Sequence, residues 1–456
     1  MKQFSILTLE ESLGKDITYK ALSKQYGKDL YYDKCNWLIT RIIRTQLKSE
    51  KGLNELVNIH TDTLKLFLGN RYYQKVIKTL TELEIIYVNK IYSAGNFSYS
   101  YALKKKLGNK ELVEVDIRNK SFREKLKKQG TKEYQEVVQD KVLYKVLVNT
   151  TRLLLTNKRF GYIEEFSPLL KSNLKGNSDR GEYDDNEYVI VWYDDNVQLR
   201  VSKYEAYFKS FRLLNKTTNP KDLMNITVYF SPTINKLGRV YHIGASIPRL
   251  VRECFVTKDK ESIWEVDMAS AQPTILILEW LNTLKEKQIL TSQEKEEYQK
   301  YYDLIIRGEL YAYVKEYSQN LKNLEYGKMK KAILTTLNSE QKKTPLYFDL
   351  KHLFPLFMSW IDQIKKDKGY KAVSHLGHRT EANIFVEVYK QLPDELFALI
   401  IHDCILTTEP QTLKIKELLM KRLKSLYPNV FSEKADLNKM FKIDRVTHHT
   451  ITFNGK

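Results

Sequence analysis

Two aspartates that lie far apart in the sequence stand where short apolar runs break off. Asp267 ends a strand-like run that begins at Ile263, and Asp403 interrupts the apolar run Leu399–Leu406. A lysine-rich segment that we predict to be helical lies between them. Carboxylates at strand ends can hold two divalent ions about 3.5–4 Å apart, the arrangement that serves in-line phosphoryl displacement. The pattern therefore favours a fold in which two distant strands meet.

The charge of the chain indicates which partners to expect. Among its 456 residues are 75 lysines and arginines against 56 acidic residues, a formal net charge of +19. A globular enzyme with such an excess usually neutralises phosphates, so we expect nucleic acid as a partner. The alternative is a generally lysine-rich surface, which the high content of Lys, Asn, Ile and Tyr also fits.

Other features narrow the cellular setting. The three cysteines are far apart and odd in number, so neither a disulfide framework nor a cysteine zinc site is expected. No run of about 18 apolar residues is present, so we expect no membrane span. The start of the chain lacks the apolar core of a signal peptide. We therefore expect a cytoplasmic protein in a reducing compartment.

The first part of the chain predicts a small helical domain that ends in a hairpin. Residues 72–86 carry apolar side chains at helical spacing, and strand-like runs at 85–90 and 97–103 follow around a glycine turn. This outline resembles the winged-helix modules of plasmid and phage replication proteins, whose relatives place a helix in the major groove. The alternative is a helical packing domain that binds no DNA.

The remaining pattern predicts an α+β protein. We expect strands at 263–268, 396–401 and 404–406, which alternate with helices at 273–284, 326–337, 379–392 and 412–427. The expected division is an N-terminal winged-helix-like domain at 1–110, a helical connecting region at 111–230, and a catalytic region at 231–456. Hydrophobic residues make up 42% of the chain, which is enough for sizeable cores.

The lysine-rich helix has a face suited to a nucleoside triphosphate. Lys330, Leu334 and Asn338 are spaced four apart and share one side of the helix. A lysine there can meet a phosphate, while the residues beyond it can meet sugar and base. Lysine-rich helices are more often solvated faces, so this motif gains weight only from its place between the two aspartates.

The order of three short motifs resembles the family A DNA polymerases and their relatives, the single-subunit phage and mitochondrial RNA polymerases. Asp267 matches the metal-binding residue of their first motif. Lys330 and Leu334 match their lysine helix, and Lys331 adds a second cation. The pair His402-Asp403 matches the hairpin of their third motif. The resemblance covers roughly residues 230–410.

That resemblance also implies contacts with the substrates. Gln272, five residues after Asp267, stands where DNA-synthesising members carry a glutamate that blocks the 2′-hydroxyl, and Asn338 replaces their base-stacking tyrosine. The basic segment before the first motif and the helix before the third would hold the primer-template. The residues implied for this contact are Arg239, Arg249, Arg252, His378 and Arg379.

The resemblance implies a right-hand polymerase fold, with a palm and helical fingers and thumb. Asp267 and Asp403 would bind two Mg²⁺ ions, with Mn²⁺ as an alternative, and Lys330 and His402 would complete the catalytic set. We expect a DNA polymerase of a phage or mobile element that uses nucleoside triphosphates. The alternatives are an RNA polymerase or primase of the same superfamily, a non-catalytic replication initiator, and a two-metal nuclease.

Overall fold

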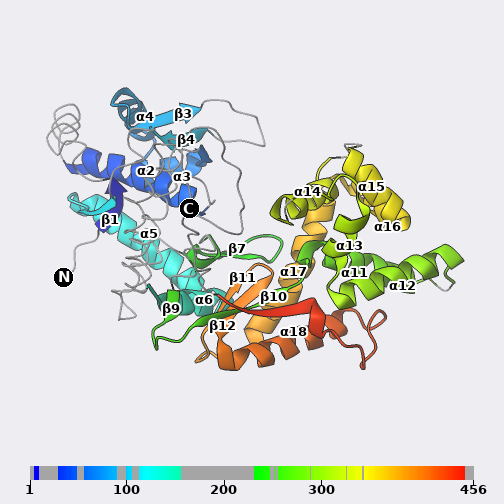
Figure 1. The fold of residues 1–456 in the computed structure, drawn as a ribbon. Coiled ribbons are helices and arrows are strands. Elements are labelled where there is room, and N and C mark those ends of the chain that lie inside the picture. Colours follow the sequence, from blue (N-terminus) through cyan, green and yellow to red (C-terminus); the bar gives the residue numbers. More distant parts are fainter. Residues whose placement is uncertain are drawn as a thin grey trace, which may run out of the picture. The chain divides into compact units, whose positions relative to one another are not determined.

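The computed structural model describes most of the chain in eleven segments, which are residues 5–9, 29–48, 56–89, 99–104, 112–155, 231–246, 252, 255–287, 289–324, 326–340 and 344–446. They fall into two compact units (Figure 1). The first contains the described residues up to 155, Ser231 and Pro232, and the described residues of His242–Lys258. The second contains Thr233–Tyr241 and the described residues from Asp259 onward.

The first unit is built around one long helix, α2, in which residues 31–40 are all buried, apolar and polar alike. Two shorter helices and a three-stranded antiparallel sheet of order β2-β4-β3 pack with it. In chain order these elements are α2 (Asp29–Lys48), β2 (Val57–Asn58), α3 (Thr61–Leu68), α4 (Tyr73–Glu82), β3 (Ile86–Asn89) and β4 (Ser100–Leu103).

The rest of the first unit joins α2 to a second pair of helices. Buried Asp33 of α2 accepts hydrogen bonds from the backbone N–H groups of Arg118 and Asn119, directly before α5 begins. Because these donors have no partner inside the helix, the carboxylate fixes the start of α5. The other elements are β1 (Ser5–Leu9), β5 (Leu112–Asp116), α5 (Lys120–Gln139), α6 (Lys141–Thr151), β6 (Leu153–Leu155), η4 (Ile243–Ser246) and β9 (Phe255–Thr257).

The second unit contains a four-stranded antiparallel sheet of order β11-β12-β10-β13. Its members are β10 (Ile263–Met268), β11 (Ala398–Ile401), β12 (Cys404–Thr408) and β13 (Phe441–Arg445). All residues of β11 and β12 are buried, which explains why they are apolar except for Thr407 and Thr408 at the end of β12. Because β10 lies between β12 and β13, the strand that carries Asp267 is an inner strand.

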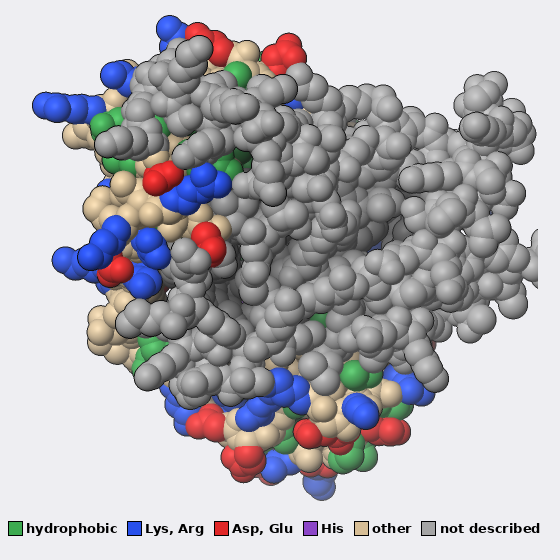
Figure 2. All heavy atoms as spheres, turned by 90° about the vertical axis from the view of Figure 1, so that its left-hand side faces the viewer, with side chains coloured by type: hydrophobic (Ala, Val, Ile, Leu, Met, Phe, Trp, Pro, Cys, Tyr) green, Lys and Arg blue, Asp and Glu red, His purple; other side chains and the backbone are tan. Residues whose placement is uncertain are grey.

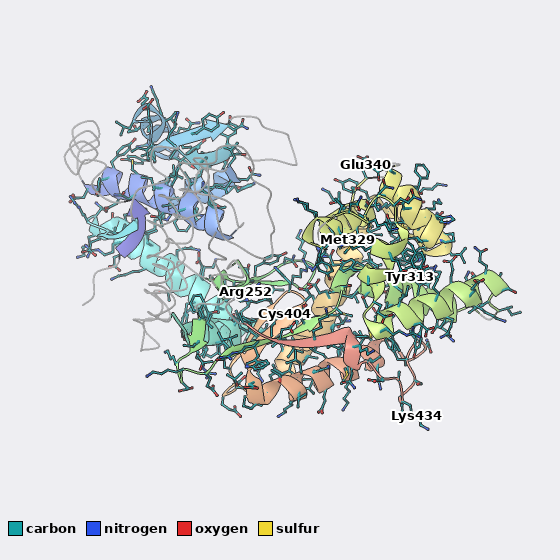
Figure 3. The ribbon with its side chains drawn as sticks, viewed as in Figure 1. Arg252, Tyr313, Met329, Glu340, Cys404 and Lys434 are labelled. Atoms are coloured by element: carbon teal, nitrogen blue, oxygen red, sulfur yellow. The ribbon has the colours of Figure 1, made fainter. Side chains whose placement is uncertain are left out.

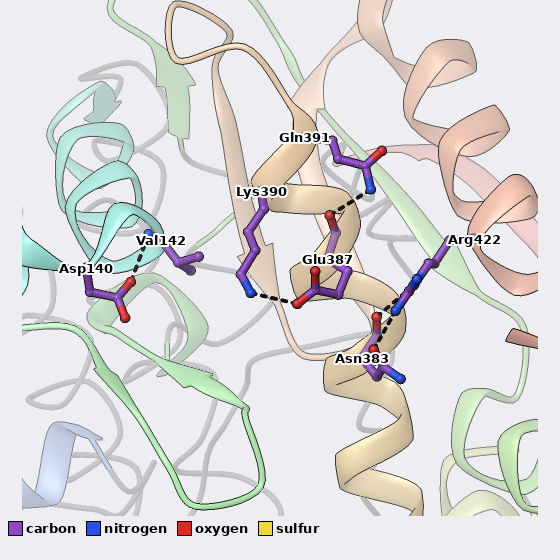
Figure 4. Close-up of polar contacts among 7 residues, drawn as sticks. All are labelled: Asp140, Val142, Asn383, Glu387, Lys390, Gln391 and Arg422. Atoms are coloured by element: carbon purple, nitrogen blue, oxygen red, sulfur yellow. Dashed lines mark hydrogen bonds and ion pairs between the residues drawn. The ribbon is translucent and has the colours of Figure 1, made fainter. Parts of the chain in front are cut away.

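Helices α17 (Lys371–Gln391) and α18 (Thr412–Leu426) pack against the strands of this sheet. Tyr389 donates from its buried hydroxyl to the carbonyl of Ala398 in β11. Arg422 of α18 donates to both the backbone carbonyl and the side-chain oxygen of Asn383 in α17 (Figure 4). These bonds fix α17 relative to the sheet and to α18.

Three further helices of the second unit share an aromatic core. Trp280, Tyr301 and Phe357 pack mutually at ring-centroid distances of 5.2–6.0 Å. The elements are β7 (Thr233–Ile234), β8 (Val240–Tyr241), α11 (Ala271–Lys285), α12 (Ser292–Arg307), α13 (Leu310–Tyr317), α14 (Tyr326–Asn338), α15 (Pro345–Leu353), α16 (Pro355–Lys368), η5 (Glu409–Gln411) and η6 (Asn438–Met440). No described helix combines the length and the apolar character that a membrane crossing demands.

Several sequence predictions match these elements closely. The strand predicted at 263–268 has those bounds, and the helices predicted at 326–337 and 412–427 agree to within one residue at each end. The helix predicted at 379–392 is the second half of a longer one, α17. Strand β13 and helices α15 and α16 were not predicted, and the expected three-part division of the chain stays a prediction.

Candidate active site

The first aspartate lies near the end of an inner strand. In the sheet Asp267 is opposite Cys404 of β12 on one side and Lys442 of β13 on the other. The chain turns directly after it, because Ser270 adopts a left-handed conformation (φ 52°) and α11 starts at the next residue. The strand and the tight turn together fix the direction of the backbone on both sides of Asp267.

The second aspartate lies in the two-residue turn between β11 and β12. Ile401 pairs with Cys404, so His402 and Asp403 form the turn itself. His402 adopts a left-handed conformation (φ 49°), which histidine accepts more readily than most residues. The N–H of Met268 donates to the carbonyl of Asp403 at 3.2 Å. Two residues that are remote in sequence are therefore neighbours, and Cys404, which opens β12, is labelled in Figure 3.

The electrostatics of Asp267 reflect this arrangement. Its pKa is raised to about 8, first by burial and then by the negative charges of Asp403 and Glu265. The positive charges of Lys330 and Lys442 act in the opposite direction. The two carboxylates therefore repel each other across a poorly solvated space, and nearby lysines offset only part of that repulsion.

Helix α14 contributes the predicted lysine. Its buried stripe consists of Met329, which is labelled in Figure 3, Ile333 and Leu337. Lys330 is exposed on another face. The charge of Lys330 acts on Asp267. The charge of Asp267 also adds to burial in raising the pKa of Tyr326 at the start of the helix. The first turns of α14 therefore lie close to the acidic pair.

Gln272, expected at the sugar, and Asn338, expected at the base, are in contact. The amide of Asn338, at the end of α14, donates to the side-chain oxygen of Gln272, in the first turn of α11, at 3.4 Å. The side-chain oxygen of Asn338 is buried and has no hydrogen-bond partner among the described residues. An acceptor left in this state is costly unless a ligand or water completes it.

A second polar group lies on α17. Arg239 donates to Glu381, and their side chains are only 11% and 2% exposed. His378, one turn before Glu381, has its pKa lowered to about 4, by burial and then by the charges of Arg239, His402 and His375. His378 is therefore neutral near pH 7 and can act as a hydrogen-bonding group, but not as the cation that a phosphate would need.

Some predicted site residues belong neither to the surroundings of the two aspartates nor to the polar group on α17. Arg379 is exposed on α17, whereas its neighbours Thr380 and Glu381 are buried. Lys331 is exposed and Leu334 is half-buried on α14. Arg252 belongs to the first unit and is half-buried (Figure 3). The fifth predicted contact of the primer-template, Arg249, lies outside the described residues.

Sequence reasoning missed three residues near the acids. Lys442 is opposite Asp267 on the unpredicted strand β13. Tyr311 of α13 is buried. Its pKa is raised first by burial and then by the charges of Tyr326 and Asp403. Glu381 gave no signal, because a glutamate in an amphipathic helix usually faces solvent.

The donor set fits divalent ions that prefer oxygen. Within the described segments no group of three or more His, Cys, Asp or Glu side chains is arranged as a metal site. Mg²⁺ is usually bound through one or two carboxylates together with waters and substrate phosphates, so two aspartates are a sufficient protein contribution. Mn²⁺ accepts the same oxygen ligands. A cation would also relieve the repulsion that raises the pKa of Asp267.

The comparisons with known proteins complete the description. No protein-family model matches the chain, and no curated protein matches it. Among solved structures, the chain is similar to the POL domain of Pol1 from M. smegmatis in complex with DNA primer-template and dNTP. The similarity has a TM-score of 0.37 at 13% sequence identity, and it covers 55% of this chain and 52% of that one. The chain thus spans about half the length of that structure.

Proposed function

We propose that the chain is a template-directed nucleic acid polymerase that adds nucleotides to a 3′ end, with DNA as the favoured product. The observation that carries this proposal is the pairing of β10 with β12, which brings Asp267 beside Asp403. The positive charge of Lys330 also acts on Asp267. In this proposal the four-stranded sheet is the palm and the helices around α14 are the fingers.

The proposed roles follow from the chemistry of the residues. Asp267 and Asp403 would hold two Mg²⁺ ions, which supply charge neutralisation for the triphosphate and activation of the attacking 3′-hydroxyl. Lys330 would stabilise the triphosphate, with Lys331 as a more distant cation. His402 would keep the turn in shape, since its left-handed backbone sets the position of Asp403.

The test is primer extension with matched variants. Wild-type protein, a labelled primer on a DNA template, Mg²⁺ and deoxynucleotides should give extended product. Asp403→Ala should abolish extension and leave duplex binding nearly intact. Asp444→Ala, which removes an exposed aspartate from the adjacent strand β13, should extend normally. Extension retained by Asp403→Ala would refute the assignment, and shortening of the primer without nucleotides would favour a nuclease.

The first unit suggests a second candidate function, the recognition of duplex DNA by a winged helix. Its helix, strand, two helices and hairpin follow one another in the order such a module needs. The outer face of α4 presents Gln74, Lys75 and Lys78, all exposed, while Val76 and Leu80 face the core. Polar and basic side chains on an exposed helix suit the major groove and its phosphates.

The charge elsewhere gives less guidance. On the face drawn in Figure 2, basic side chains are interspersed with acidic ones over the described part. Lys75 and Lys78 are therefore the more informative cations, because they lie on the helix that the winged-helix arrangement would present to DNA.

Salt-dependent binding tests this function. Lys75→Ala with Lys78→Ala should weaken duplex binding and reduce the slope of log K against log salt by about 1–2, since each phosphate contact contributes roughly 0.9. Lys132→Ala is the matched control, an exposed lysine of α5 that pairs with a glutamate four residues later, as Lys78 does. An unchanged slope would contradict DNA binding by α4. Site-specific binding without nucleotide incorporation would favour a replication initiator over a polymerase.

A further inference from the structure

A short hairpin in the second unit is held rigidly at its tip. Strands β7 and β8 pair Thr233 with Tyr241, and the tip between them is closed by Asn235. The side-chain oxygen of Asn235 accepts from the N–H groups of Leu237 and Arg239 at 2.9 and 3.0 Å. Gly238 supplies the left-handed conformation (φ 84°) that completes the turn. We refer to residues 233–241 as the tip hairpin.

The tip hairpin is fastened to α17. Arg239 donates to Glu381 in the nearly solvent-free pair described above. Beside this pair, a Cβ on Gly238 would lie 3.3 Å from the Cβ of Ala382, so the backbone of the hairpin approaches the helix closely. An ion pair with so little exposure is screened much less than one at the surface. Glu381 therefore anchors Arg239, and with it the hairpin, on α17.

The far end of the tip hairpin reaches the turn that carries Asp403. The ring of Tyr241 contacts the imidazole of His402 edge-on, at a centroid distance of 5.6 Å and an interplanar angle of 67°. The amide of Asn235 donates to the hydroxyl of Tyr241 at 3.4 Å. Even so, Tyr241 remains 39% exposed. A tyrosine that is held on two sides and still open to solvent leaves part of its surface free for a ligand.

We propose that Tyr241 is a stacking site for the base at the 3′ end of the strand being extended, and that Glu381 positions it through Arg239 and the tip hairpin. The proposal rests on the polymerase function proposed above. An aromatic ring stacks on any base, which suits a position that must accept every terminal nucleotide. The ring also adjoins His402, next to the carboxylate proposed to act at the 3′-hydroxyl.

Primer affinity should reveal the stacking. Replacing Tyr241 with Leu should raise the KM for primer-template roughly 5- to 150-fold, the range that corresponds to a base–aromatic stack of ~1–3 kcal/mol. The KM for nucleotide and kcat at saturating primer should change less than twofold. Tyr241→Phe should restore primer affinity, because the ring suffices. Ile234→Ala, which changes an exposed apolar residue on the same hairpin, serves as the control.

A measurement without catalysis separates this inference from the polymerase function. A primer with 2-aminopurine at its 3′ end should lose fluorescence on binding wild-type protein, and this quenching should be lost in Tyr241→Leu and kept in Ile234→Ala. Absence of extension by wild-type protein would refute the proposed function. Extension by wild-type protein, with Tyr241→Leu behaving like Ile234→Ala in both assays, would refute the stacking site alone.

The role of Glu381 is tested by a double-mutant cycle. Glu381→Ala should raise the primer KM, and Glu381→Gln should raise it less, because an amide still accepts from Arg239. If Glu381 acts through Tyr241, the variant that carries both Glu381→Ala and Tyr241→Leu should be impaired little more than Tyr241→Leu. Effects that multiply would overturn the positioning role. Thermal unfolding of each variant shows whether the fold is retained.

Discussion

Without metal, the acidic pair should destabilise the folded protein at neutral and higher pH. The pKa of Asp267 is about 8 in the folded state, against an ordinary value of 3.8. Between these values the folded protein retains a proton that the unfolded chain releases. The free energy of unfolding should therefore fall as pH rises from about 4 to about 8. Asp267→Asn removes the ionisable group and should abolish this part of the decline.

The size of the effect can be bounded. A shift from 3.8 to about 8 corresponds to roughly 6 kcal/mol at 1.36 kcal/mol per pKa unit. Relaxation of side chains and entry of water will reduce this figure, so we expect Asp267→Asn to stabilise the protein by about 2 kcal/mol or more at pH 8. With 2–4 °C per kcal/mol for a unit of this size, the Tm should rise by roughly 4–8 °C.

The assay is thermal unfolding between pH 5 and 8.5 in buffer with EDTA, followed by circular dichroism. Asp444→Asn is the control, because it changes an exposed aspartate on the neighbouring strand. Saturating Mg²⁺ should raise the Tm of the wild type more than that of Asp267→Asn. The difference in Tm between the two proteins should therefore become smaller. If Asp267→Asn lowers the Tm at pH 8, or leaves the dependence of Tm on pH as in the wild type, the inference that Asp267 and Asp403 form a buried, mutually repelling pair is wrong.

Three further predictions concern stability and selectivity. Gly308→Ala should destabilise the protein by about 1–3 kcal/mol more than Gly369→Ala in urea unfolding. Both glycines have positive φ, but only a Cβ at position 308 would lie 2.8 Å from a backbone oxygen, the carbonyl of Lys439, and equal effects would contradict this reasoning. Asp33→Ala should cost about 1–3 kcal/mol, since it leaves two backbone N–H groups before α5 without their acceptor, and a change under 0.5 kcal/mol would argue against that cap. Gln272→Ala should lower the ratio of kcat/KM for deoxy- over ribonucleotides by roughly tenfold, and an unchanged ratio would exclude Gln272 from sugar selection.

The acidic pair could be predicted from the sequence because its signals are local. Ile263–Met268 is a short, largely apolar run that contains the acids Glu265 and Asp267, and Leu399–Leu406 is an apolar run broken at His402-Asp403; such runs identify buried strands and their ends. The helical period also indicated which residues share a face of α14. These features depend on neighbours within a few positions, which a sequence displays directly.

The missed features depend on distant partners. Strand β13 is only five residues long and alternates apolar and charged residues over just the first four, and its pairing with β10 becomes apparent only in three dimensions. Glu381 is buried because it meets Arg239, which lies 142 positions away. The contact of Gln272 with Asn338 spans 66 positions. Periodicity reports the side of an element on which a residue lies, but not which residue it meets there.

The pairing of β10 with β12 also bears on how this protein can change in evolution. The pairing of the neighbouring strands sets the separation of the two aspartates. The length of the helical segment between Ala271 and Leu396 does not change that separation. Whole helices can be gained or lost there while the acids stay together. A deletion of one residue inside a strand would be far more damaging, since it would turn the carboxylate to the opposite face.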